Sequence, residues 1–104
     1  MKHYVRIHYA EPDLGGELLN IAELEDVTEV ECTMLRMIEL DPAETITGIY
    51  AEGRVVGRAN TPMGTVPHPD SYGQFDGITA TRISRDEFEG LWQEALHKLG
   101  LPGA

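Results

Sequence analysis

The 104-residue sequence has one cysteine, few basic residues and no long apolar run, and each shortage excludes a class of protein. Cys32 alone excludes an intrachain disulfide framework and a zinc knuckle built on several cysteines. Eight Lys and Arg stand against eighteen Asp and Glu, a formal net charge of −10. Because nucleic acids and anionic membranes bind basic faces, we expect direct binding to neither. No purely apolar run exceeds four residues, so we expect no membrane-spanning segment.

Length and composition describe a single domain, residues 1–104. A chain of this mass buries roughly 65% of the surface that its unfolded form exposes, which suffices for one core. Hydrophobic residues make up 41% and charged residues 25%, as in ordinary globular proteins, which argues against disorder. The sequence opens directly on a strand pattern without the apolar core of a signal peptide, so we expect a cytoplasmic protein.

Alternation of apolar and polar residues predicts antiparallel strands through the first sixty residues. The second strand is also compatible with a short helix. The alternation in the third strand breaks around Leu35, which predicts a bulge or burial on both faces. Five apolar residues are expected on one face of that strand: Val30, Cys32, Met34, Ile38 and Leu40. The expected strands cover residues 4–9, 17–24, 29–40, 46–50 and 54–59, the last two forming a hairpin whose turn places Gly53 at positive φ.

Residues 60–82 have the composition of a long loop, with three prolines and three glycines among them. Such a stretch is unusual in so small a domain and is often functional. The end of the chain is a clear helix pattern. Ser84 and Glu87 form a capping box. An apolar stripe then predicts a helix over residues 85–99, made of Phe88, Leu91, Trp92, Ala95, Leu96 and Leu99.

The predicted fold class is therefore α+β: an antiparallel sheet of four or five strands with one C-terminal helix packed on one face. No catalytic or metal-ligand motif accompanies it, so we expect no catalytic residue, no metal ligand and no cofactor. His3 and His8 point to opposite faces of one strand. His68 lies in the loop, without the spacing typical of zinc sites. Cys32 is expected to pack in the core rather than act as a nucleophile.

Negative charge is concentrated in the first half of the chain, where residues 1–52 hold twelve acids and three bases. Five of these carboxylates fall within nine residues: Glu23, Glu25, Asp26, Glu29 and Glu31. One interpretation is a solvated surface that keeps the protein soluble. The other is a partner-binding surface, which would steer a cationic protein toward contact or fill a cleft that normally takes phosphates.

Several segments together carry a resemblance to a known family. They are Glu17–Glu23, Tyr50–Val55, Val66–Pro67 and, most closely, Ile83–Glu89 with Trp92 and Ala95. In these segments and in element order the chain resembles a family of small, mainly actinobacterial domains of unknown function. It departs from the family by an extra Asp41–Ile46 segment. The resemblance implies a small α+β fold and no activity, and domains of this kind occur as immunity proteins.

The leading functional hypothesis is a non-enzymatic acidic protein-binding domain, specifically an immunity protein that neutralises a basic bacterial toxin. The alternative is a small enzyme or ligand-binding subunit with a pocket between sheet and helix under the 60–82 loop. His68, Asp70 and Tyr72 would line that pocket, with His68 as its acid/base. A third hypothesis is a homodimer formed through exposed strand edges.

Overall fold

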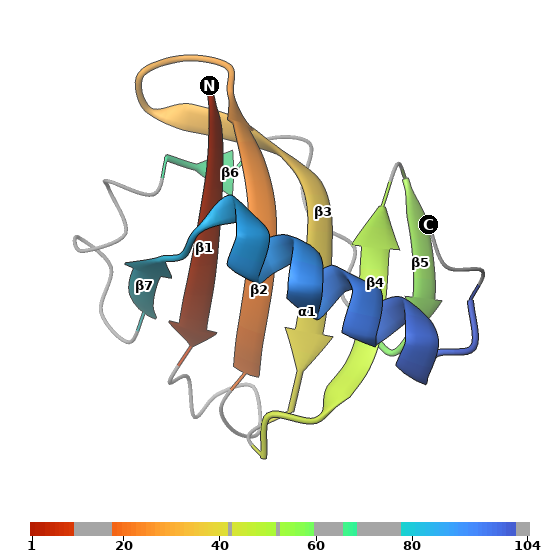
Figure 1. Ribbon diagram of the computed structural model, residues 1–104. Helices are drawn as coiled ribbons and strands as arrows, with labels where there is room; N and C mark the ends of the chain where they lie inside the picture. Colours follow the sequence, from red (N-terminus) through yellow and green to blue (C-terminus); the bar gives the residue numbers. More distant parts are fainter. Residues whose placement is uncertain (10–17, 42, 52, 60–65, 69–77, 102–104) are drawn as a thin grey trace.

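The computed structural model describes residues 1–9, 18–41, 43–51, 53–59, 66–68 and 78–101. These residues form one sheet and one helix (Figure 1). The strands are β1 (Lys2–Tyr9), β2 (Leu18–Asp26), β3 (Glu31–Leu40), β4 (Ile46–Ala51), β5 (Arg54–Gly57), β6 (Val66–Pro67) and β7 (Ile78–Arg82), and the helix is α1 (Arg85–Lys98).

The strands of the described residues follow the order β5-β4-β3-β2-β1-β7, and the two-residue β6 pairs with the start of β3 off this path. Every pairing is antiparallel. The described part of the segment expected over 17–24, residues 18–24, is therefore a strand, and the predicted class is confirmed. The expected hairpin also forms, with Gly53 at φ 78°.

The expected count of four or five strands is wrong, because six lie on the main path. The missing strand, β7, lies in the segment expected to be a loop. In this strand Ile78 and Ala80 pack against the core and alternate with two threonines. Five residues are too few for this alternation to be recognised as a strand in the sequence. Pairing with β1 at the sheet edge, from Val5–Arg82 to Tyr9–Ile78, makes this segment a strand.

A bulge in β3 decides which side chains share a face. The β2–β3 pairing passes from Glu23–Arg36 directly to Leu24–Met34, so Leu35 is an extra residue, which is one of the two alternatives that the broken alternation left open. The bulge reverses the alternation of the strand. Cys32 lies on the face away from α1, and the expectation that it shares a face with Ile38 is therefore wrong.

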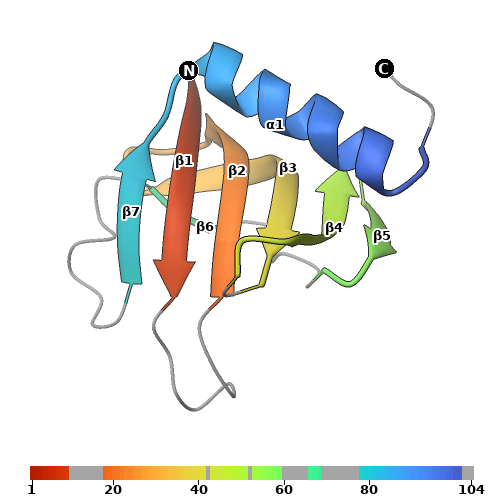
Figure 2. The ribbon, with the colours of Figure 1, turned by 60° about the horizontal axis from the view of Figure 1, so that its bottom comes forward.

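Both faces of the sheet are buried, and α1 covers one of them (Figure 2). The layer between the helix and the sheet is made of side chains from both: Leu19, Ile21, Ile38, Leu40, Ile46 and Ile49 from the strands, and Phe88, Trp92, Ala95 and Leu96 from α1. The layer on the far face is made of Val5, Ile7, Ala22, Leu24, Cys32, Met34 and Met37. Ser84 caps α1 as predicted, since its hydroxyl accepts the amide of Glu87 at 3.0 Å.

A partly buried ion cluster links α1 to the sheet. Arg36 donates from Nε and Nη2 to the two oxygens of Glu23, at 2.7 and 3.0 Å, and also to both oxygens of Glu89 on the helix. Its guanidinium carbon lies 4.8 Å from the ring centroid of Phe88 and 5.2 Å from that of Trp92. The Arg36 guanidinium holds the pKa of Glu23 below its ordinary value.

Replacing Glu23 with glutamine tests this cluster. At pH 7 we expect E23Q to lower the free energy of unfolding by about 2 kcal/mol, because Arg36 loses a charged hydrogen-bond partner. The pKa of Glu23 is lowered in the folded state, so its ionised form adds stability above its ordinary value of 4.5. That stability is lost as the pH falls through the folded pKa. Urea unfolding between pH 3 and 7 should therefore show wild type and E23Q converging in acid.

The control for this experiment is E94Q, which changes an exposed glutamate on the same helix. We expect it to stay within about 0.5 kcal/mol of wild type at all pH values. A deficit in E23Q that persists unchanged at pH 3 would show that the ionised carboxylate is not its source.

Candidate functional site

The connection between β2 and β3 is ordered by hydrogen bonds to one threonine side chain. Asp26 and Cys32 face each other as the last residue pair between the strands. Beyond them the Thr28 hydroxyl accepts the amides of Val30 and Glu31, at 3.2 and 3.1 Å. Side chain to backbone bonds of this kind are how threonine stabilises turns. The hairpin therefore has a defined conformation from its base to its end.

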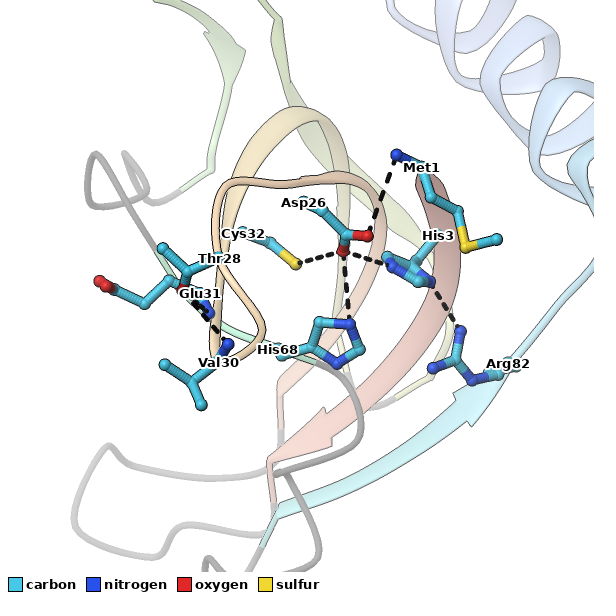
Figure 3. A network of polar contacts seen from close by, with 9 residues as sticks. All are labelled: Met1, His3, Asp26, Thr28, Val30, Glu31, Cys32, His68 and Arg82. Atoms are coloured by element: carbon cyan, nitrogen blue, oxygen red, sulfur yellow. Dashed lines mark hydrogen bonds and ion pairs between the residues drawn. The ribbon is translucent and has the colours of Figure 1, made fainter.

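Four side chains with metal-ligating or proton-transferring chemistry meet at the base of the turn of this hairpin, on the face away from α1 (Figure 3). By the base of the hairpin we mean this end, where the strands pass into the turn. They are His3, Asp26, Cys32 and His68, and their ligand atoms all lie within 4.8 Å of one another. Asp26 Oδ1 is the centre of the group. It lies 2.6 Å from His3 Nε2, 3.3 Å from His68 Nε2 and 3.6 Å from Cys32 Sγ. We call these four residues the Asp26 cluster.

Sheet pairing explains why these distant residues meet. The β1–β2 register places His3 opposite Leu24, on the same face as Cys32. β6 pairs with the start of β3, and directly after it the amide of His68 donates to the carbonyl of Val30 at 2.9 Å. The rings of His3 and His68 then meet edge to face at 4.7 Å between centroids.

Hydrogen bonding assigns the proton on His3. Arg82 Nη1 lies 2.9 Å from His3 Nδ1, and a guanidinium can only donate. Nδ1 therefore accepts, and Nε2 carries the proton that is donated to Asp26 Oδ1. His3 is buried at 7% exposure, whereas the carboxylate of Asp26 is 34% exposed.

The same contacts shift two pKa values. The hydrogen bond from His3 lowers the pKa of Asp26, which therefore stays ionised. Burial, followed by the bond to the Asp26 carboxylate, raises the pKa of Cys32 to about 11. The resting cluster thus contains an anionic carboxylate beside a neutral thiol.

Sequence reasoning placed Cys32 in the core correctly, since its side chain is fully buried. It did not foresee the convergence of His3, His68 and Asp26. The ligands come from four separate segments, so no local spacing encodes them. The argument that His3 and His8 face opposite ways holds, but the partner of His3 is a histidine 65 positions away, which only the register of β6 brings near.

The five carboxylates of the expected partner-binding surface are divided by the structure. Glu23 is 4% exposed and is held by Arg36 beneath the helix, and Asp26 is the centre of its cluster. Glu25, Glu29 and Glu31 remain exposed. Between them lie Val27 and Val30, which are 56% and 65% exposed, large values for apolar side chains. The expectation that Val30 shares the apolar face of the third strand is wrong, because β3 begins at Glu31 and Val30 belongs to the connection before it. We call Glu25, Val27, Glu29, Val30 and Glu31 the hairpin tip.

A cavity of about 290 Å³ also lies between sheet and helix. Its lining includes Arg6, Glu44, Glu94 and Lys98, on the face opposite the Asp26 cluster. The pocket expected from sequence was to be lined by His68, which is on the far face, and by Asp70 and Tyr72, which lie outside the described residues. The observed cavity is therefore a different one.

Comparison with protein-family models, with curated proteins and with solved structures finds no match to this chain. The resemblance to an actinobacterial domain family thus stays a prediction. Within the described part of the chain, no helix has the length and apolar character needed to cross a membrane. Function has to be argued from the chemistry of the hairpin tip and of the Asp26 cluster.

The thiol of Cys32 provides a direct check on the geometry of the cluster. Because it is fully buried and its pKa is raised to about 11, we expect it to be nearly inert in the native protein. At pH 8 a disulfide reagent should modify it at least about 100-fold more slowly than it modifies the unfolded chain. Absorbance of the released thiolate measures both rates, with the chain in guanidinium as the reference. Equal rates in the two states would contradict the buried, protonated thiol.

Proposed function

We propose that the protein is a non-enzymatic binding domain whose hairpin tip docks on a basic protein partner. The observation that carries this proposal is the exposure of Val27 and Val30 among three exposed carboxylates. They are two of the four large apolar side chains exposed in the described residues, and they lie only three positions apart. Apolar side chains at the centre of a contact, with a polar rim, are typical of protein interfaces.

Charge would determine the kind of partner. Glu25, Glu29 and Glu31 are exposed within two positions of a valine in the sequence, and the whole chain carries a formal net charge of −10. A negative surface of this kind accelerates encounter with a positive partner and repels an acidic one. The complementary surface is therefore an apolar pocket or side chain flanked by Lys and Arg.

The order of the hairpin also favours docking. Within the connection, the amides of Val30 and Glu31 donate to the Thr28 hydroxyl. At the start of the connection, Asp26 contacts His3 and His68. Less conformational freedom then has to be lost on binding. The concrete form of the proposal is an immunity protein that covers the active site or substrate cleft of a basic bacterial toxin, which the resemblance in the sequence suggests and the acidic tip supports.

The test is a selection of displayed random twelve-residue peptides on the native protein, followed by affinity measurement of the enriched peptides. We expect these peptides to combine Lys or Arg with an apolar anchor. The triple reversal E25K, E29K and E31K should slow their association, weaken its dependence on salt and leave the melting temperature nearly unchanged. The pair V27S and V30S should speed dissociation instead.

Matched controls separate a docking surface from general attraction to an acidic protein. E94K changes the net charge by as much as E29K does, but on the exposed face of α1, and V55S removes an exposed valine from β5. Both should bind the selected peptides as wild type does. Peptides without basic residues, or equal losses in E94K and E29K, would disprove docking at the hairpin tip.

A further inference from the structure

The Asp26 cluster lies beneath the hairpin tip and is not needed for the docking chemistry, so its composition calls for a separate explanation. We infer that His3, Asp26, Cys32 and His68 form a binding site for one borderline divalent transition metal, with Zn²⁺ as the natural ion. Their four ligand atoms already lie within 4.8 Å of one another, before any ion is considered.

The donor set selects the class of ion. Two imidazole nitrogens, one thiolate and one carboxylate oxygen match the ligands and the number that tetrahedral zinc takes in proteins. Calcium and magnesium require shells made of oxygen, and here Asp26 is the only carboxylate of the four. Because four protein ligands leave no open position, the site would be structural rather than catalytic.

The distances from Asp26 are close to those of a metal site, whereas ligand atoms that lie up to 4.8 Å apart would have to approach each other by about 1 Å. Ligand atoms about 2.0 to 2.3 Å from a tetrahedral ion lie about 3.3 to 3.8 Å from each other. Asp26 Oδ1 is already 3.3 Å from His68 Nε2 and 3.6 Å from Cys32 Sγ. The 2.6 Å contact of Oδ1 with His3 Nε2 is a hydrogen bond, and it would have to open by less than about 1 Å.

Protons have to move on three ligands for the ion to enter. His68 binds through Nε2 only when its proton is on Nδ1, because Nε2 lies 3.3 Å from Asp26 Oδ1 in the resting cluster and would otherwise donate to it. The Cys32 thiol loses its proton to solvent as the metal–sulfur bond forms. His3 transfers its proton from Nε2 to Nδ1, which frees the Nε2 lone pair for the metal. Arg82 opposes the change on His3, because it donates to Nδ1 in the resting state and cannot accept a proton there. Arg82 therefore turns away on binding, and its charge keeps the affinity below what the four ligands alone would provide.

The arrangement also has a structural consequence. Ligands from β1, from the end of β2, from the start of β3 and from the residue after β6 would be joined through one ion. A metal there would clamp the base of the hairpin to β1 and hold the segment around His68 against β3. Zinc sites of this kind contribute directly to folding stability.

The first experiment uses the wild-type chain without a tag and four divalent metals. Titration with Zn²⁺ should show one ion per chain and raise the melting temperature by about 10 °C at a hundredfold excess over the dissociation constant, whereas Mg²⁺ and Ca²⁺ should have no effect. Co²⁺ in place of Zn²⁺ should give the visible bands of a tetrahedral site and an ultraviolet thiolate-to-cobalt charge-transfer band. That band needs no variant, and its absence would overturn the site.

Substitutions then assign the ligands. We expect C32S, a near-isosteric change, and H68Q, at a half-buried position, each to weaken zinc binding at least about 100-fold. H97Q removes an exposed histidine on α1 and is the matched control, with unchanged affinity. Zinc binding that survives C32S and H68Q but is lost in H97Q would mean an adventitious surface site, and would overturn the inference.

Arg82 distinguishes a metal site from a purely structural hydrogen-bond cluster. R82Q removes a positive charge and supplies an amide oxygen that can accept the Nδ1 proton of His3, the usual arrangement behind a metal-bound histidine. We expect zinc to bind about tenfold more tightly to R82Q, although the metal-free variant loses the bond to His3. Weaker binding in R82Q would show that the proposed proton transfer on His3 is wrong.

Discussion

One extra residue in β3 determines how the two faces of this sheet are used. Cys32 and Arg36 are four positions apart, so a regular strand would point both side chains to the same face. The bulge at Leu35 sends them to opposite faces. Arg36 then pairs with Glu23 and Glu89 beneath the helix, and Cys32 meets Asp26 on the far face. The ion cluster and the candidate metal site both depend on that shift of register.

The acidic composition is used in two physically different ways. Glu23, Glu89 and Asp26 are held by an arginine or a histidine of the fold, Glu23 at a buried position and the other two at partly exposed ones. Glu25, Glu29 and Glu31 are exposed at the end of one hairpin. Carboxylates that the sequence presents as one cluster therefore belong to three environments, and the three at the hairpin tip are those we propose to recognise a partner.

The Asp26 cluster and the hairpin tip are parts of one structural unit. Asp26 is the residue where β2 ends, and the tip begins with its neighbours on either side. An ion at the cluster would hold the base of a hairpin whose end carries the recognition chemistry. Order beneath the contact surface would reduce the entropy lost on docking.

The amino-acid sequence by itself determined the class of fold, the capped helix with its apolar stripe, the β4–β5 hairpin and the break in the alternation of β3. These features depend on neighbours within a few positions, so periodicity and capping residues reveal them. Tertiary structure alone decided the edge strand β7, the burial of Glu23 and the meeting of His3 with His68. Those depend on which strands pair and in which register, and contacts between residues 65 positions apart leave no local pattern in the chain.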